Sequence, residues 1–221
     1  MTLAREVVVP GMLAEYRRFG ELVKGLSDAD WDSPSRCEGW RVADVAAHVV
    51  GQLTDVVNLR LEGLGTPEVT KRQVDEHRGR ATAELADELD ASAELAGGLA
   101  SSFDDAAWEA PGPPGVPGTL GSGLEALWFD TYLHADDIRS AVGLPTSQGP
   151  GLRASLSHIA QELSDQGWGP ADLAFEGFEV FPISGGGGKT IGGDPFGFVL
   201  VSTGRGDPAS MDLDESVNIY R

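Results

Sequence analysis

An acid and a histidine that could share a metal, Asp130 and His134, lie four positions apart within Trp128–Arg139. In a helix this spacing places both side chains on one face, about one turn apart. Other side chains expected on that face are Leu127, Thr131, Ile138 and Ala141. The acid and the histidine would therefore point into the protein, where charged side chains are rare unless they are paired or bound to a metal. This segment is the candidate functional site.

A second candidate ligand is His48, which lies one turn after Val45 beside the apolar stripe of another expected helix. Two imidazoles and a carboxylate from facing helices would provide three ligands and leave the fourth position of a zinc ion for water or substrate. The same donors also suit nickel, iron or manganese. Asp137, three residues after His134, is placed to accept a hydrogen bond from that imidazole. From spacing alone a hydrogen-bonded core histidine is the commoner arrangement, so both interpretations stay open.

The other reactive side chains have simpler interpretations. His77 lies in the charged run Asp75–Arg78, which is typical of a solvated helix face, and His158 lies in a predicted helix with Ser155 and Ser157 nearby. Cys37 is the one cysteine, so no intrachain disulfide can form. No histidine or helix terminus that would activate its thiol is evident from the sequence. We interpret Cys37 as a structural residue in a reducing compartment.

Composition narrows the range of partners. The 16 basic and 35 acidic residues give a net charge of −19, which repels nucleic acid and anionic membranes. There is no run of about 18 apolar residues for a membrane span, and acidic and polar residues come too early for a secretory signal. We therefore expect a cytoplasmic protein, monomeric or homodimeric, that acts on a small-molecule substrate.

Apolar residues recur at helical spacing in four long segments, which predicts a four-helix bundle. The four segments are residues 3–26, 42–61, 70–101 and 120–142. In the first segment Pro10–Gly11 is a break, so its firm helix is expected to start there. The Pro- and Gly-rich stretch Ala110–Gly118 separates the third segment from the fourth. Bundle cores are common places for metal sites, which agrees with the candidate ligands.

A change in composition after the Pro- and Gly-rich stretch Leu144–Gly151 indicates a domain boundary. Beyond it, a helix is predicted at about 152–165. Apolar runs that favour β-strands follow at Phe175–Ile183, Phe196–Ser202 and Val217–Tyr220. The predicted fold class is α+β, with a four-helix bundle over residues 1–145 and a small α/β domain over residues 150–221.

Two glycine-containing motifs lie in the expected second domain. Ser184–Thr190 suggests a phosphate-binding loop, but Ile183 stands where that pattern needs its first glycine. A flexible turn between strands fits this segment better. Arg205, flanked by glycines, could bind a substrate carboxylate through two guanidinium nitrogens. Pairing with Asp207 or another acid is the structural alternative.

Three segments taken together resemble a known family. The stretch from Trp31 to His48, with Cys37–Val42 at its centre, resembles the N-terminal signature of the mycothiol-dependent maleylpyruvate isomerase family. Asp130–Gly143 resembles the second signature of that family, and the tail Val201–Arg221 is similar to the end of many members. The resemblance therefore covers nearly the whole chain.

The resemblance implies a DinB-like four-helix bundle with a divalent metal, usually zinc, held by two histidines and an acid, followed by a small α/β domain. His48, Asp130 and His134 fall on those ligand positions. Two departures bear on the site. The acidic ligand of the family is typically Glu, which is one methylene longer than Asp130, so ligand distance and metal identity are affected. Arg41 stands where members often have a helix-capping Ser or Thr, so the cap must come from elsewhere.

Three functions are compatible with these residues. The resemblance favours a metal-dependent enzyme that uses a low-molecular-weight thiol, mycothiol, for cis–trans isomerisation or S-transfer on an electrophile. In that enzyme Arg205 would hold a substrate carboxylate. A hydrolase would use the same metal to activate water and would need no thiol. A non-catalytic binding or regulatory protein with a vestigial site is the third, and Asp130 in place of Glu keeps it open.

Overall fold

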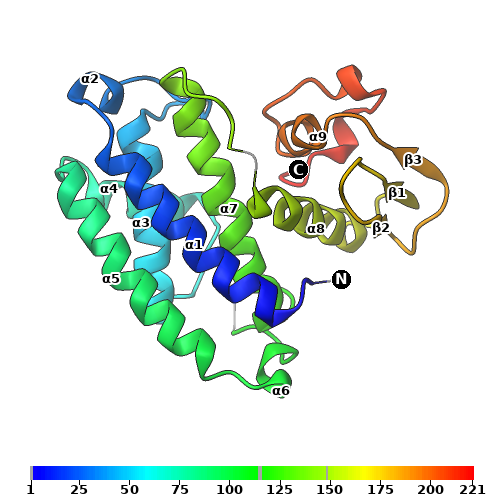
Figure 1. Ribbon diagram of the computed structural model, residues 1–221, viewed down its shortest axis with the longest axis horizontal. Helices are drawn as coiled ribbons and strands as arrows, with labels where there is room; N and C mark the ends of the chain where they lie inside the picture. Colours follow the sequence, from blue (N-terminus) through cyan, green and yellow to red (C-terminus); the bar gives the residue numbers. More distant parts are fainter. Residues whose placement is uncertain (1, 114–115, 148) are drawn as a thin grey trace. The chain divides into compact units, whose positions relative to one another are not determined.

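The computed structural model describes residues 2–113, 116–147 and 149–221. The chain forms two compact units, one from Ala4 to Gln148 and one from Gly149 to Arg221 that also includes the N-terminal residues up to Leu3. The sequence-based division into domains stays a prediction, because compactness alone does not show that a unit folds independently. Figure 1 shows the helices of the first unit in blue to green and those of the second in yellow to red.

Four long helices build the first unit, as predicted. They are α1 (Arg5–Lys24), α3 (Val42–Val57), α5 (Thr82–Ser101) and α7 (Leu120–Ala141). α1 and α3 each pack against α5 and α7 (Figure 1). The largest fully buried side chains of this core are Met12, Tyr16, Phe19, Leu53, Leu85, Leu89, Trp128, Tyr132, Leu133 and Ile138. Burial of these stripes is the main contribution to the stability of the bundle.

The first helix begins earlier than the sequence predicts. α1 starts at Arg5 and runs through Pro10, so the expected start at Pro10–Gly11 is wrong. A proline removes one backbone hydrogen bond, but Val8 and Met12 on either side are fully buried and hold the segment helical. Gly11 makes room for a ring of α7, because a Cβ there would lie 2.1 Å from the Cη2 atom of Trp128.

The predicted third helix, residues 70–101, is in fact two helices. α4 (Pro67–His77) ends where Arg78 is extended and Gly79 has a φ of 79°, a conformation that glycine adopts readily. α5 then starts at Thr82. The chain therefore turns between the two helices, and α4 packs on α3 as a fifth helix beside the bundle.

Two shorter helices lie in the connections of the first unit. α2 (Asp28–Trp31) occupies part of the expected loop 27–40, and α6 (Asp105–Trp108) precedes the break before α7. That predicted break, Ala110–Gly118, includes residues 114–115, and the predicted boundary Leu144–Gly151 includes residue 148. These three residues lie outside the part of the chain that the structure describes. At the start of α3, the Oδ2 atom of Asp44 accepts the backbone N–H of Arg41 at 3.0 Å, so an acid of the first turn supplies the missing cap.

The second unit combines helices with a small sheet. Its elements are α8 (Pro150–Asp165), β1 (Ala171–Leu173), β2 (Phe181–Ile183), β3 (Lys189–Ile191), α9 (Pro195–Ser202), η1 (Pro208–Met211) and η2 (Glu215–Val217). The strand order is β2-β1-β3, with β1 antiparallel to β2 and parallel to β3. The fold is therefore α+β, a helical bundle followed by a small sheet with helices.

Two of the predicted strands are wrong. Phe196–Ser202 lies in α9, which Pro195 starts and which the Asp194 side chain caps by accepting the backbone N–H of Phe196 at 3.1 Å. A short, continuously apolar run cannot distinguish a buried strand from a buried helix, so the cap decides. Val217–Tyr220 contains the end of η2 and a turn.

The glycine run after β2 forms a turn that leads into β3, as predicted, and not into the helix that a phosphate-binding loop requires. It carries the chain past β1 from one edge of the sheet to the other. The N–H of Gly187 donates to Oδ2 of Asp172 at 3.0 Å, and a Cβ on Gly188 would lie 2.4 Å from the carbonyl oxygen of Pro170. Only glycine permits this close crossing.

Among the described residues, no helix is both long and apolar enough to cross a membrane.

Candidate metal centre

The three candidate ligands come together inside the bundle. Oδ2 of Asp130 lies 3.7 Å from Nε2 of His48 on α3, and Oδ1 of Asp130 lies 3.6 Å from Nε2 of His134 on α7. One ligand atom from each of the three residues lies within 4.8 Å of the others. Both separations from Asp130 are too long for hydrogen bonds. Bonds of about 2.0–2.1 Å to a tetrahedral zinc ion place ligand atoms about 3.3–3.4 Å apart, so the Asp130 side chain fits such a site despite its length.

The two imidazole rings present the same edge to Asp130. Their planes are nearly perpendicular, at 85°, with ring centroids 5.1 Å apart. Nδ1 of His48 lies 3.0 Å from Oε1 of Gln73, and Nδ1 of His134 lies 2.9 Å from Oδ2 of Asp137. Each Nδ1 therefore faces a hydrogen-bond acceptor and carries a proton, so Nε2, which faces Asp130, is the nitrogen of each ring that can coordinate a metal. This donor set suits a divalent metal such as zinc.

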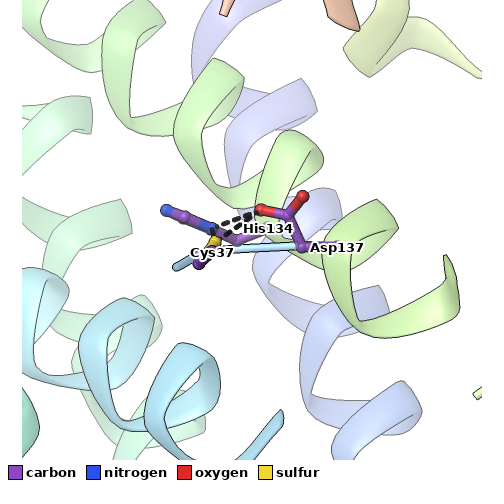
Figure 2. A group of neighbouring side chains, drawn as sticks. All are labelled: Cys37, His134 and Asp137. Atoms are coloured by element: carbon purple, nitrogen blue, oxygen red, sulfur yellow. Dashed lines mark hydrogen bonds and ion pairs between the residues drawn. The ribbon is translucent and has the colours of Figure 1, made fainter. Parts of the chain in front are cut away.

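Asp137 is fixed from several sides, as Figure 2 shows for two of its neighbours. Its Oδ2 atom accepts from His134, the contact that the sequence predicts, and also from the thiol of Cys37 at 3.2 Å. Its Oδ1 atom accepts from Nε of Arg36 at 3.1 Å. Arg36 and Cys37 precede α3, so these bonds tie the loop before α3 to α7.

Sequence reasoning missed the place of Cys37. Its sulfur lies 3.9 Å from Nδ1 of His134, although 97 positions separate the two residues in the chain. Cys37, His134 and Asp137 also form a second group whose ligand atoms approach one another within 4.8 Å. This group uses Nδ1 of His134, which already donates to Asp137. The thiol therefore supports the orientation of His134 through Asp137 (Figure 2).

The surroundings of His134 change its protonation. Burial lowers the pKa of His134, but the negative charge of Asp130 and the hydrogen bonds to Asp137 and Cys37 outweigh that effect and raise the pKa from 6.5 to about 10. In the metal-free protein this imidazole is therefore positively charged at neutral pH. A metal that binds at Nε2 must displace a proton.

An indole ring lies against both imidazoles. The ring centroid of Trp40 is 5.4 Å from that of His48 and 6.4 Å from that of His134, to which it is stacked at 30°. Trp40 is partly exposed, whereas His48 and His134 are 5% and 7% exposed. The loop before α3 thus contributes a ring that shields the imidazoles from water.

The other histidines lie away from this centre. His77 is buried, with Nδ1 2.8 Å from the carbonyl oxygen of Gln73 and Nε2 3.0 Å from Oε1 of Glu88, so the predicted solvated face is wrong. The error follows from treating α4 and α5 as one helix, because the chain turns after His77 and α5 then places Glu88 against its Nε2 atom. His158 lies on α8 of the second unit.

Arg205 also belongs to the second unit, whereas His48, Asp130 and His134 belong to the first. It follows α9 rather than a strand, and its Nη1 atom donates to the carbonyl oxygen of Thr203 at 3.3 Å. Its role as a contact for a substrate anion stays a prediction, as does the role of the three ligands.

A family model decides where this chain belongs. The model of the mycothiol maleylpyruvate isomerase N-terminal domain matches residues 12–139, a range that includes His48, Asp130 and His134. The chain belongs to this family. The resemblance found in the sequence is thereby confirmed, and it extends over α1 to α7.

Solved structures of the mycothiol maleylpyruvate isomerase family share this fold. The mycothiol-dependent maleylpyruvate isomerase superposes with a TM-score of 0.58 at 20% sequence identity, and a mutant of that enzyme with 0.61 at 19%. Each comparison covers 92% of this chain and 90% of the other. At such identity the likeness concerns the fold alone. A comparison with curated proteins finds no match.

Proposed function

We propose that this family member is a metal-dependent enzyme that uses a low-molecular-weight thiol, mycothiol, for isomerisation or S-transfer on a small electrophilic substrate. The observation that carries the proposal is the convergence of His48, Asp130 and His134 with both Nδ1 atoms already engaged. Membership of the family adds support, because the related enzyme of the same fold is described as mycothiol-dependent.

His48, Asp130 and His134 would hold the metal, which we expect to be zinc. When bound, zinc would supply a Lewis acid that keeps a thiol in its thiolate form at neutral pH. Nδ1 of each imidazole lies within hydrogen-bond distance of Gln73 or Asp137, so Nε2 of each ring would be the coordinating atom. Trp40 excludes water from one side of the imidazoles. In this proposal Arg205 binds a carboxylate of the substrate.

The decisive experiment joins metal analysis to a thiol-dependent assay. Protein purified without an affinity tag is analysed by plasma mass spectrometry and assayed with maleylpyruvate and with other electrophiles, with and without mycothiol. We expect about one zinc per chain and turnover that requires the thiol. His48→Ala and His134→Ala should lose both metal and activity, whereas His158→Ala, a histidine of the second unit, should keep both.

Two outcomes would contradict the proposal. Turnover without any thiol would instead favour a hydrolase with a metal-activated water. A protein that binds no zinc, or whose His134→Ala variant keeps full metal and activity, would favour a binding protein with a vestigial site. Small-molecule recognition, a monomeric or homodimeric state and the absence of nucleic-acid binding stay predictions of the sequence.

A further inference from the structure

Gln73 on α4 joins the candidate metal centre to a buried charge. The side chain is 1% exposed, and each of its two polar atoms has a partner. Oε1 lies 3.0 Å from Nδ1 of His48, and Nε2 donates to Oδ2 of Asp55 at 2.7 Å. Gln73 thus connects two side chains of α3 that lie about two turns apart on that helix.

The direction of the Gln73 amide follows from the charge of Asp55. Asp55 is fully buried, and two guanidinium groups hold it, with Nε of Arg60 2.7 Å from Oδ1 and Nη2 of Arg72 2.7 Å from Oδ2. A carboxylate held in this way can only accept hydrogen bonds. The amide of Gln73 must therefore turn its NH₂ group to Asp55 and its oxygen to His48. An amide oxygen also only accepts, so Nδ1 of His48 must be the donor.

A close approach of two helices makes this contact possible. A Cβ at Gly51 of α3 would lie 2.8 Å from Cβ and 3.2 Å from Cα of Gln73. Cβ atoms essentially never approach so closely, so α4 can reach this depth only because position 51 carries no side chain. Gly51 lies three residues after His48, on the same side of α3. The local packing is built to bring Gln73 to that imidazole.

We propose that Gln73 is a positioning residue for the metal: it fixes the Nδ1–H tautomer and the ring orientation of His48, so that Nε2 is the ligand atom. Asp55, with Arg60 and Arg72, sets the direction of the Gln73 amide. This inference rests on the proposed function, because it concerns the same metal. It assigns a role to α4, a helix on which sequence reasoning placed no site residue.

The test compares Gln73→Met with Val74→Ala. Methionine keeps the length of the side chain but loses both hydrogen bonds, whereas Val74, buried on the same helix, contributes only packing. We expect Gln73→Met to weaken zinc binding by about 10–100-fold, the usual effect of removing a group that orients a ligand. Val74→Ala should leave zinc binding unchanged even if it lowers the melting temperature.

A second measurement reads the hydrogen bond directly. Cobalt(II) replaces zinc, and the proton spectrum is recorded in water and in deuterium oxide. Wild-type protein should show two exchangeable, hyperfine-shifted Nδ1–H signals, one from His48 and one from His134. In Gln73→Met the His48 signal should exchange rapidly and disappear, while the His134 signal persists. Val74→Ala, which changes only packing on the same helix, should keep both signals.

The outcomes separate this inference from the proposed function. If wild-type protein binds zinc and Gln73→Met binds it equally well with both signals retained, Gln73 has no positioning role, although the metal site stands. If wild-type protein binds no zinc, both proposals fail. Should Gln73→Met not fold, the wild-type cobalt protein still decides, because coordination of His48 through Nδ1 would overturn the inference.

Discussion

The two imidazoles of the candidate metal centre are held by groups of different charge. On α7, Nδ1 of His134 donates to the carboxylate of Asp137, which lies next to Arg36. On α3, Nδ1 of His48 donates to the neutral amide of Gln73. The carboxylate of Asp55 is the next group along these hydrogen bonds, and it contacts Gln73 rather than His48. Each series of hydrogen bonds ends at arginine side chains, Arg36 beside Asp137 and Arg60 and Arg72 beside Asp55, so the orientation of each acceptor is fixed.

This difference has consequences for the two ligands. A carboxylate in contact with an imidazole raises its basicity and strengthens it as a ligand, whereas an amide orients it with less effect on charge. The negative charges of Asp130 and Asp137 contribute to the raised pKa of His134. We therefore expect His134 to be the stronger metal ligand and His48 to be the ligand whose placement depends on helix packing.

The largest effect is expected from removing the charged support. Asp137→Ala should weaken zinc binding by about 100-fold, the upper end for such groups, and thus more than Gln73→Met. It should also lower the free energy of unfolding of the metal-free protein by about 3 kcal/mol, because Arg36 and the protonated His134 lose a buried partner. Zinc titration and urea denaturation measure the two effects. An affinity no weaker than that of Gln73→Met would contradict the comparison.

An intermediate effect is expected from pH. With a pKa of about 10 in the metal-free protein, His134 must lose its proton when zinc binds, so zinc affinity should rise by about tenfold from pH 7 to pH 8. Protonated His134 also stabilises the metal-free fold. That contribution is complete below the ordinary pKa of 6.5 and is lost as the pH rises through about 10.

Calorimetry in buffers of different ionisation enthalpy would measure the proton released by His134 on zinc binding. We expect release of about one proton per zinc at neutral pH from this residue. Equal affinity at pH 7 and pH 8, with no proton release, would show that the charges around His134 do not hold the proton as described.

The smallest effect is expected at Trp40, which contacts both imidazoles without a hydrogen bond. Trp40→Phe should change zinc affinity by no more than about threefold, roughly 0.6 kcal/mol, the low end for ring contacts. Its main consequence should be spectroscopic. Zinc binding should alter the tryptophan fluorescence of wild-type protein and leave that of Trp40→Phe nearly unchanged, although four of the five tryptophans remain. If zinc alters the fluorescence of Trp40→Phe as much as that of wild-type protein, another tryptophan causes the change.

Sequence alone predicts much of this arrangement because helical periodicity is strong in the bundle. The spacing of Asp130 and His134 and the stripe beside His48 are local properties, and they predict that these side chains face the interior. Asp137 could be predicted for the same reason, since it lies on the same helix as its partner. The family signatures add the expectation that the two helices meet at a metal.

Contacts across the fold could not be predicted in the same way. The roles of Gln73 and His77 could not be predicted because α4 and α5 form one periodic pattern in the sequence, although the chain breaks at the extended Arg78 and at Gly79. The contact of Cys37 with His134 depends on how a loop folds onto α7. In the second unit, the buried helix α9 has the apolar composition of a strand, so composition without the Asp194 cap misleads.

Arg36 lies in the loop that covers the imidazoles, and it also holds the carboxylate that orients His134. It holds Asp137, which orients His134, and through Nη2 it also binds Oδ2 of Asp136 at 2.5 Å. The same short loop carries Trp40 over the imidazoles. Because Trp40 and Arg36 belong to the same loop, we expect a displacement of the indole to disturb the contact between Arg36 and Asp137. A more mobile loop would therefore expose the two imidazoles and, at the same time, make the orientation of His134 less rigid.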